Sequence, residues 1–191
     1  MISLELEQKI NNHLNWLNDK NGCQLDLSNQ NIGECKFENL NLNSSMYTDA
    51  KFDSINFINT NLHGTYFINC MFNKVVFQDV TLRKSEFHDC IFKNCIFKNS
   101  NITKAEFFNL KSESTRFIEV DLGWSFIDNS DFSNGEFVEV GLGSTIISDT
   151  KLMGTNLKNL NFSKDYPMKF SRNDVITIIK DEASFRKNIL S

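Results

Sequence analysis

The chain has 191 residues, a formal net charge of −4 and a sequence pI of about 5.4. This length predicts one domain with small terminal elements. The acidic balance disfavours direct nucleic-acid binding, which typically requires a basic face. The first residues contain neither a basic start nor a long apolar stretch, so we expect no signal peptide and no membrane span. The five cysteines, an odd number, indicate reduced thiols and a cytoplasmic protein.

The chain begins with a predicted amphipathic helix over residues 3–20. Ser3 can cap its N-terminus, and acidic residues in the first turn complement the helix dipole. One face carries the apolar residues Leu6, Ile10, Leu14 and Leu17. Asn21 and Gly22 end the helix. We therefore assign residues 1–22 as an N-terminal helix that caps the domain that follows.

From Leu27 to Phe162, every fifth residue is a large apolar side chain, with Ser112 as the single exception. A spacing of five matches neither the 3.6 residues per turn of a helix nor the period of 2 of a strand, so it predicts a repeat architecture. Two places before each central residue, side chains are mostly small, and two places after it Asn, Asp, Ser and Gly predominate. Because Asn, Asp and Gly tolerate the backbone of tight corners, each repeat predicts two inward residues and one corner.

Residues 20 positions apart share a chemical character. The central residues from Leu42 to Leu142 are all aliphatic, and those from Phe37 to Phe137 are all phenylalanine. Twenty residues are four repeats, so a four-sided coil stacked on itself explains these columns. About seven coils then form an all-β solenoid over residues 23–164, roughly 34 Å long at about 4.8 Å per coil. At the exception, Leu110 occupies the small inward place, and we expect Leu110 and Ser112 to have exchanged roles.

This organisation resembles the pentapeptide-repeat family, whose consensus is Ala-(Asp/Asn)-Leu-x-x. Matching segments include AKFDS at 50–54, TNLHG at 60–64 and TNLKN at 155–159. The resemblance extends over about 140 residues and implies a right-handed quadrilateral β-helix, here with short α-helices at both ends. The sequence contains no nucleophile–base constellation and no Gly-rich phosphate loop. We therefore expect a non-enzymatic interaction or structural module without a cofactor.

After Phe162 the register ends, and residues 165–191 are predicted to contain a C-terminal helix. Ser171 with Asp174 resembles an N-terminal cap. Apolar residues follow at roughly helical spacing, namely Val175, Ile178, Ile179, Phe185 and Ile189. Two roles are open for this helix. It could cap the last coil, or it could form a homodimer contact, because topoisomerase-protecting members of the family dimerise through their C-termini.

Cysteines and an Asn/Asp column are the candidates for metal or redox chemistry. Cys35, Cys70, Cys90 and Cys95 all occupy the small inward place, where a thiol acts as a compact apolar group. No second type of ligand recurs at metal spacing. The column of Asn and Asp at positions 29, 49, 69, 89, 109, 129 and 149 could hold cations, but a ladder of turns explains it better. We expect no metal site.

One side of the predicted rod carries apolar residues in outward places. They are Met46, Tyr66, Ile68, Phe108, Phe126 and Ile146, with Trp124 outward nearby beside glycines. Single exposed apolar residues are ordinary, but a row along one side is typical of a partner-binding surface. The alternative is that a terminal helix or loop covers this row.

Acidic residues gather in the C-terminal half of the repeats. Residues 113–149 hold one base, Arg116, and eight acids: Glu113, Glu119, Asp121, Asp128, Asp131, Glu136, Glu139 and Asp149. In quinolone-resistance members of the family an acidic rod mimics duplex DNA and binds a type II topoisomerase, so the resemblance implies DNA gyrase as an alternative partner. This chain lacks the long loops found in several of those members, and a solvated acidic face is the simpler interpretation. We expect a protein partner, with no direct nucleic acid and no membrane.

Overall fold

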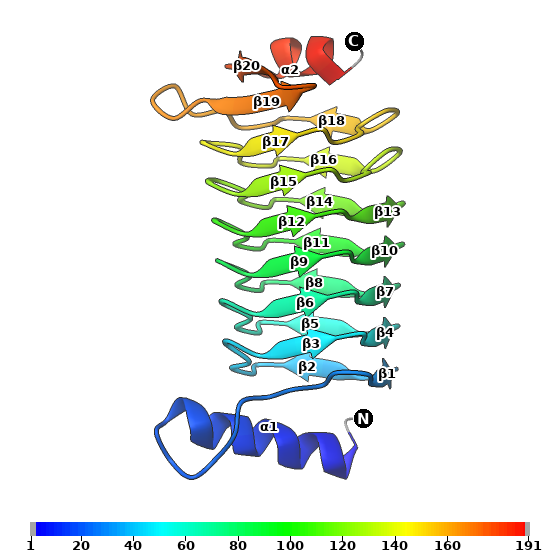
Figure 1. Cartoon of the computed structure of the whole chain (residues 1–191), viewed down its shortest axis with the longest axis vertical. Coiled ribbons are helices and arrows are strands. Elements are labelled where there is room, and N and C mark those ends of the chain that lie inside the picture. The colour runs from blue at the N-terminus through cyan, green and yellow to red at the C-terminus, as the bar shows by residue number, and fades with distance from the viewer. Residues whose placement is uncertain (1–2, 190–191) are drawn as a thin grey trace.

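The computed structural model describes residues 3–189, which form a rod with a short helix at each end (Figure 1). α1 (Leu4–Leu17) lies across the N-terminal end of the rod. The Ser3 side chain accepts a hydrogen bond from the Leu6 N–H at 3.2 Å, as expected of an N-cap. Ile10 is buried, and Leu6 and Leu14 pack against the core. The predicted N-terminal helix is confirmed, although it ends at Leu17 and not at residue 20.

Between the helices, three-residue strands stack into sheets on three sides of the rod. The five-stranded sheet contains β1 (Asn31–Gly33), β4 (Lys51–Asp53), β7 (Met71–Asn73), β10 (Ile91–Lys93) and β13 (Lys111–Glu113). The seven-stranded sheet contains β2 (Lys36–Glu38), β5 (Asn56–Ile58), β8 (Val76–Gln78), β11 (Ile96–Lys98), β14 (Arg116–Ile118), β16 (Glu136–Val138) and β18 (Asn156–Lys158). The eight-stranded sheet contains β3 (Met46–Thr48), β6 (Tyr66–Ile68), β9 (Glu86–His88), β12 (Glu106–Phe108), β15 (Phe126–Asp128), β17 (Ile146–Ser148), β19 (Met168–Arg172) and β20 (Val175–Ile179).

The fourth side has single bridges instead of strands, such as the one between Asn41 and Asn61. In the repeat sheets, paired residues lie 20 positions apart and run parallel, as in the pairs Phe37–Phe57 and Phe57–Phe77. A coil of 20 residues with four sides is therefore confirmed, and with it the β-solenoid fold.

Central residues fill the core as columns of stacked side chains. Along the seven-stranded sheet, the rings from Phe37 to Phe137 stack with centroids 4.6 to 5.0 Å apart. The distance follows from the spacing of the coils, about 4.8 Å. Each buried ring removes roughly 150–250 Å² from water. The period of five in the sequence is therefore the period of the core.

Each corner of the coil is made by one residue in the left-handed backbone region. Every fifth residue from Asn29 to Asn159 has a φ between 43° and 72°. Asn, Asp and Gly fill most of these positions, while other L-residues lose roughly 1–2 kcal/mol there. Side-chain amides add hydrogen bonds between coils, for example from Asn59 Nδ2 to Asn39 Oδ1 at 2.7 Å and from Asn129 Nδ2 to Asn109 Oδ1 at 2.8 Å. The expected ladder of turns is confirmed.

The small inward place is more than a space filler. Ser, Thr and Cys side chains there donate hydrogen bonds to the carbonyl 23 residues earlier, as from Ser85 Oγ to the Leu62 carbonyl at 2.7 Å and from Thr60 Oγ1 to the Phe37 carbonyl at 2.7 Å. Leu110 is 1% exposed and points into this core, whereas Ser112 is only half-buried. The expected exchange of large and small residues at this repeat is confirmed for Leu110.

The C-terminal segment differs from the prediction. Residues 175–179 form the strand β20, antiparallel to β19, and not the start of a helix. Asn173 and Asp174 have φ values of 49° and 63°, so they make the tight turn of a hairpin, and Ser171 with Asp174 is not a helix cap. α2 (Glu182–Ile189) is a separate short helix that lies over the last coil (Figure 1).

Within residues 3–189, neither helix has the length and apolar character needed to cross a membrane.

Candidate interaction surfaces

The eight-stranded sheet holds the expected apolar row on its outer face. Met46 and Tyr66 pair across β3 and β6, and Ile68 lies on β6 beside them. Their exposed fractions are 37%, 39% and 37%. These three side chains form a patch near the N-terminal end of the sheet.

A second patch lies nearer the C-terminal end of the same face. Phe126 pairs with Ile146, and the rings of Phe108 and Phe126 lie 5.3 Å apart. Between the two patches Tyr66, Glu86, Glu106 and Phe126 follow one another on neighbouring strands, so two carboxylates interrupt the apolar row. The row is therefore divided, and we name its two parts together the apolar face: Met46, Tyr66, Ile68, Phe108, Phe126 and Ile146.

Neither terminal helix covers the apolar face, because α1 and α2 lie at the two ends of the rod (Figure 1). The hairpin instead extends the sheet beyond β17. Ile178 and Ile176 of β20 pair with Lys169 and Ser171 of β19, and both isoleucines are exposed. Sequence analysis missed Ile176 because it assigned this segment to a helix. The run of β-branched residues from Val175 to Ile179, directly after Asn173-Asp174, is the strand signal that could have identified it.

Trp124 lies at a corner between the fourth side and the eight-stranded sheet, apart from the apolar face. It is 56% exposed, with a φ of 64°. Its ring is 5.3 Å from that of Tyr166, at an interplanar angle of 48°. Gly123 beside it is buried, and a Cβ there would lie 3.3 Å from the Gly143 carbonyl oxygen.

The eight acids do not form one stripe. Glu113 and Asp131 lie on the five-stranded side, Glu136 on the seven-stranded sheet, Asp128 on the eight-stranded sheet, Asp121 on the fourth side, and Glu119, Glu139 and Asp149 at corners. Glu136 accepts a hydrogen bond from Arg116 Nε at 2.7 Å, and this contact holds the pKa of Glu136 below its usual range. The closest acidic grouping is Glu119 and Glu139 on successive coils, with Asp121 nearby on the fourth side.

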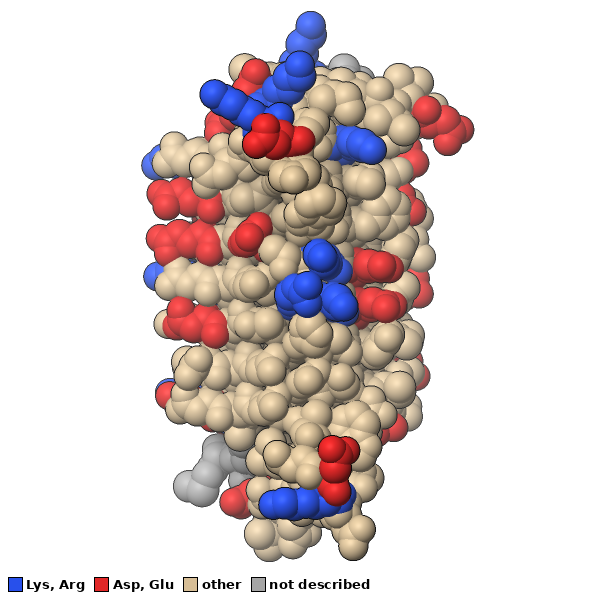
Figure 2. All heavy atoms as spheres, turned by 90° about the vertical axis from the view of Figure 1, so that its left-hand side faces the viewer, with Lys and Arg blue, Asp and Glu red and all other residues tan. Residues whose placement is uncertain are grey.

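Figure 2 faces the fourth side and shows basic side chains gathered midway along the rod, with acidic side chains on both borders. Arg83 follows the bridge residue Thr81 on this side, and Lys84 and Lys104 lie at its corner with the eight-stranded sheet. Arg83 and Lys84 act on His63, whose pKa is lowered first by burial and then by these two charges. Basic side chains therefore interrupt the acidic surface.

Residues expected at a dimer contact divide into two groups. Ile179 and Phe185 are 0% and 2% exposed, and Phe185 packs edge-on against Phe162 and Phe170. Ile189 also packs against the core. Val175 and Ile178 are exposed. Only the exposed strand residues are free to contact a second copy.

The thiols are placed as structural groups. Cys70, Cys90 and Cys95 are at most 1% exposed and donate to backbone carbonyls, as Cys90 does to the Phe67 carbonyl at 3.3 Å. Burial raises the pKa of Cys95 to about 11, so its reactive thiolate is scarce near neutral pH. Within residues 3–189, no group of three or more His, Cys, Asp or Glu side chains is arranged to hold a metal ion.

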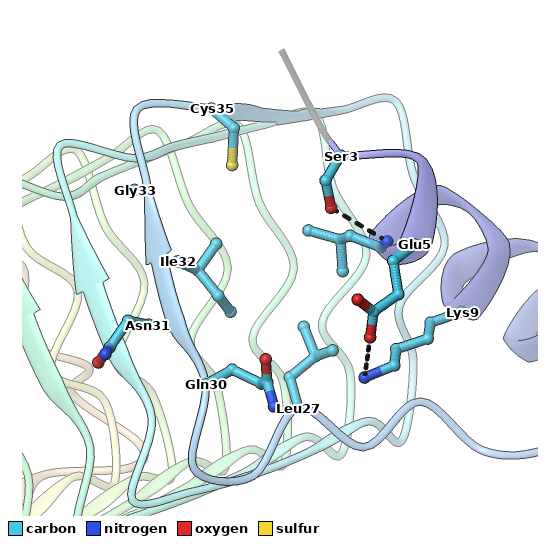
Figure 3. Close-up of a pocket in the computed structure, with 10 residues that line it drawn as sticks. Ser3, Glu5, Lys9, Leu27, Gln30, Asn31, Ile32, Gly33 and Cys35 are labelled. Atoms are coloured by element: carbon cyan, nitrogen blue, oxygen red, sulfur yellow. Dashed lines mark hydrogen bonds and ion pairs between the residues drawn. The ribbon is translucent and has the colours of Figure 1, made fainter.

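A cavity of about 200 Å³ lies between the first turn of α1 and the first coil (Figure 3). Its polar walls include the ion pair of Glu5 and Lys9, 3.3 Å apart, and its apolar walls include Leu27 and Ile32. Cys35 also lines it, and burial raises the pKa of this thiol. These charges neutralise each other and the thiol is not activated, so the cavity is the space left beneath a capping helix.

Comparison with known proteins agrees with the fold. A family model described as a pentapeptide repeat region matches residues 20–107. A trypsin-treated variant of QnrB1, a plasmid-mediated fluoroquinolone resistance protein, is 20% identical over 71% of this chain and 70% of that chain, with a TM-score of 0.51. This likeness concerns the fold alone.

Two other solved structures match with TM-scores too low to carry an argument. One is a pentapeptide repeat protein of the Arabidopsis thaliana thylakoid lumen, 16% identical over 58% of this chain and 67% of that chain, with a TM-score of 0.30. The other is HetL of the cyanobacterium Nostoc, a pentapeptide repeat protein involved in heterocyst differentiation regulation, 6% identical over 85% and 95%, with a TM-score of 0.27. A search of curated protein sequences finds no match.

Proposed function

Because the chain belongs to the pentapeptide-repeat family, we propose that it is a non-enzymatic module that binds a protein partner through its apolar face. One observation carries the proposal: outward aromatic, Met and Ile side chains on the eight-stranded sheet that the terminal helices leave uncovered. Aromatic residues and Met are enriched in protein interfaces. Stacked coils hold these side chains on a rigid sheet, so a partner binds with little ordering of this surface.

Site-specific photo-crosslinking in extracts of the source cells tests this function. A benzoylphenylalanine probe replaces Phe108 on the apolar face or, as the matched control, Lys98 on the seven-stranded sheet. We expect a discrete protein adduct from position 108 alone, lost when Tyr66→Ser and Phe126→Ser are added. Equal adducts from both positions, or adducts that survive both substitutions, contradict the proposal.

A second candidate function is protection of a type II topoisomerase such as DNA gyrase by mimicry of duplex DNA. The stacked acids Glu119 and Glu139 and the likeness of fold to a fluoroquinolone resistance protein support it. The scatter of the other acids over all sides of the rod weakens it, as do the basic side chains of Arg83 and Lys84.

A supercoiling assay with gyrase and a quinolone tests the mimic directly. Protection at micromolar protein that is lost in Glu119→Lys/Glu139→Lys supports mimicry. An unchanged inhibition curve with and without the protein rules it out.

We also propose a homodimer through β20, refining the expected C-terminal contact. β20 is the last strand of the eight-stranded sheet, and within the described residues no strand pairs with its outer edge. Val175, Ile176 and Ile178 are 67%, 64% and 44% exposed there. An exposed, apolar edge favours strand pairing between copies. Analytical ultracentrifugation should give twice the monomer mass, and Ile176→Lys/Ile178→Lys should give the monomer. A monomer at all concentrations excludes this dimer.

We also propose that the protein is located in the cytoplasm, a reducing compartment. The support for this assignment is that all five cysteines are free thiols and that four of them fill the core in that form. Localisation of a tagged copy by microscopy and fractionation tests it, and recovery outside the cytoplasm contradicts it.

A further inference from the structure

The corner between the fourth side and the eight-stranded sheet carries three large side chains on successive coils. At the next corner along the coil, every twentieth residue from Asn29 to Asp149 is Asn or Asp. Here, three successive coils instead place Lys84, Lys104 and Trp124 in the left-handed region, with φ values of 60°, 59° and 64°. Large L-residues are uncommon in this conformation. Lys74, Glu119 and Glu139 adopt it at other corners, so the distinguishing feature here is the run of three large side chains, two of which are cations.

The side chains of the two lysines are not fixed by a polar contact among the described residues. Neither makes an ion pair in the described part of the chain, and neither takes part in an amide ladder like that of Asn59 and Asn39. They stack on adjacent coils, about 4.8 Å apart along the backbone, and Arg83 precedes Lys84. Like charges this close repel each other. A bound negative group would offset this repulsion.

A hollow beside the two lysines gives an incoming chain room. Its volume is about 540 Å³, and it is lined by Ser44, His63, Gly64 and Tyr66, by the two lysines, and on the side of the eight-stranded sheet by Glu86 and Glu106. Gly64 occupies the same corner one coil earlier, and because it has no side chain it leaves space next to Lys84. Lys84 and Lys104 are exposed and extend over this hollow.

The width of the positive surface selects the kind of anion. Glu86 and Glu106 border it on the eight-stranded sheet, and Asp121 borders it on the fourth side. Figure 2 shows the basic cluster as a narrow feature between acidic side chains. A broad polyanion such as duplex DNA would cover these carboxylates and be repelled. A single extended segment that runs along the corner would meet only the bases.

Trp124 continues the corner one coil beyond Lys104 and supplies an apolar anchor. Its side chain is 56% exposed, and its ring lies 5.3 Å from the ring of Tyr166. Exposed Trp and basic residues in one line are typical of hot spots for protein segments. A segment that runs along this corner would therefore meet the cations of Lys84 and Lys104 first and the ring of Trp124 next.

We propose that Arg83, Lys84, Lys104 and Trp124 form a docking ridge for an extended acidic segment of a partner protein. Carboxylates of the segment bind the three cations, and the apolar residue that follows them packs on the indole of Trp124. The ridge adjoins the apolar face at Tyr66 but shares no residue with it, so the ridge residues can be substituted while the apolar face stays intact.

Fluorescence polarisation with a labelled peptide of four glutamates followed by leucine and phenylalanine tests the ridge. The full chain should bind this peptide, and binding should weaken as salt rises because exposed charges carry it. Lys84→Asn/Lys104→Asn should weaken binding about tenfold. The same variant should unfold at an equal or higher urea concentration, because Asn fits the left-handed corner. Trp124→Asn should also weaken binding without loss of stability.

Lys74→Asn is the matched control, since Lys74 has a φ of 53° at a different corner and carries the same charge. It should leave peptide binding unchanged. Three results overturn the proposal: no binding of the peptide at millimolar concentration, an equal loss of binding in Lys74→Asn, or a fall in stability of Lys84→Asn/Lys104→Asn. Tighter binding of a single-stranded oligonucleotide than of the peptide also overturns it, in favour of a nucleic-acid site.

Discussion

Tyr47 occupies a central position that holds phenylalanine in the next three coils of its column. Its ring stacks on Phe67 at 4.9 Å, its side chain is 0% exposed, and its hydroxyl has no hydrogen-bond partner among the described residues. A buried unpaired hydroxyl costs about 1–3 kcal/mol. Tyr47→Phe should therefore raise the free energy of unfolding by about 1 kcal/mol, measured as a higher urea midpoint at constant m-value. Phe67→Tyr should do the reverse. A lower midpoint for Tyr47→Phe would show that the hydroxyl is satisfied.

The stability of the N-terminal end of the rod depends on pH through His13. It is 0% exposed, and its Nδ1 accepts a hydrogen bond from the Leu25 N–H at 3.0 Å. Burial lowers the pKa of His13 below its ordinary value of 6.5. The neutral ring therefore stabilises the fold above pH 6.5, and this contribution is lost as pH falls from 6.5 through the folded pKa.

Amide hydrogen exchange, corrected for intrinsic rates, checks this pH dependence. Protection of α1 and of the Leu25 N–H should fall between pH 7 and pH 5, where ordinary carboxyl groups do not titrate. His13→Gln keeps an acceptor without a titratable ring and should remove this dependence. The same loss of protection in His13→Gln would assign the effect to another group.

At the residue scale, sequence periodicity predicts which side chains point inward because the core repeats exactly with the coil. It even predicted the inward place of Leu110 at the irregular repeat. It did not predict that Ser and Thr in the small inward place donate to carbonyls of the preceding coil, as Thr145 does to the Leu122 carbonyl at 2.7 Å. Those partners lie 23 residues away, and only stacked coils bring them together.

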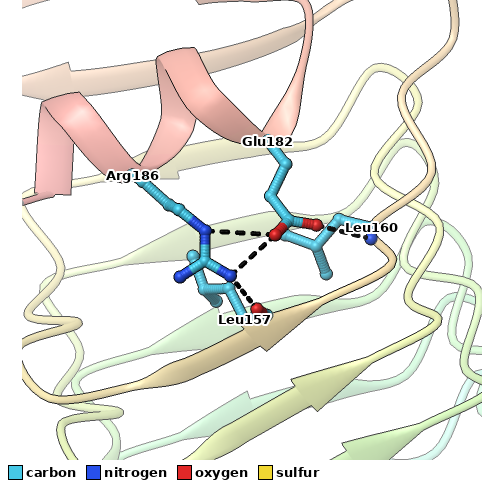
Figure 4. A network of polar contacts seen from close by, with 4 residues as sticks. All are labelled: Leu157, Leu160, Glu182 and Arg186. Atoms are coloured by element: carbon cyan, nitrogen blue, oxygen red, sulfur yellow. Dashed lines mark hydrogen bonds and ion pairs between the residues drawn. The ribbon is translucent and has the colours of Figure 1, made fainter.

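Among the elements, α2 satisfies backbone groups that an eighth coil would otherwise pair. The Glu182 carboxylate accepts a hydrogen bond from the Leu160 N–H at 3.1 Å, and the Arg186 guanidinium donates to the Leu157 carbonyl (Figure 4). Arg186 Nη2 and Glu182 Oε1 lie 2.7 Å apart. These contacts, the Leu160 amide first, hold the pKa of Glu182 below its usual range. The pair closes the open end of the rod.

Glu182→Ala should release the C-terminal cap. Leaving the Leu160 amide unpaired should destabilise this end by about 1–3 kcal/mol. The expected result is faster amide exchange at β18 and α2 with no change at β2. Glu182→Gln, which keeps an acceptor, should have a smaller effect. Uniformly faster exchange along the rod would contradict a local cap.

The hairpin is the element that sequence analysis assigned incorrectly, and the reason is physical. Val175, Ile178 and Ile179 fit a helical spacing of three and four. However, all five residues of the segment VITII at 175–179 are β-branched. Such runs favour strands. Asn173-Asp174 before them is a sequence typical of a two-residue hairpin turn. Exposure could not be read from the pattern, because it depends on the hairpin extending a sheet built by distant coils.

For the whole rod, the surface was predicted less well than the core. Eight acids lie close together in the sequence, within residues 113–149. Because one coil takes 20 residues, a segment of 20 or more residues is distributed over all four sides of the rod. Glu113 and Asp128, near each other in the chain, lie on different sheets. Charge clusters therefore arise from residues about 20 apart, as Lys84 and Lys104 do. Proximity in sequence is a poor guide to function in this fold.

A stack of coils with two caps should open from its ends, because each coil contacts only its neighbours. The cysteines report this directly. Cys23 is exposed before the first coil, Cys35 is 6% exposed beneath α1, and Cys70, Cys90 and Cys95 are at most 1% exposed. With a thiol-specific disulfide reagent, Cys23 should react at once, Cys35 at the rate at which α1 opens, and the other three only on global unfolding.

Ile10→Ala separates end opening from global unfolding, since Ile10 is the buried apolar anchor of α1 at 4% exposure. Loss of this side chain removes about 2–5 kcal/mol of packing from the cap alone. The Cys35 thiol should then react faster by mass-spectrometric assay, while Cys70, Cys90 and Cys95 keep their rates, because their coils do not contact α1. Equal acceleration of all four thiols would mean that the rod unfolds as one cooperative unit, and the N-terminal helix would then be part of the fold's nucleus and not a separable cap.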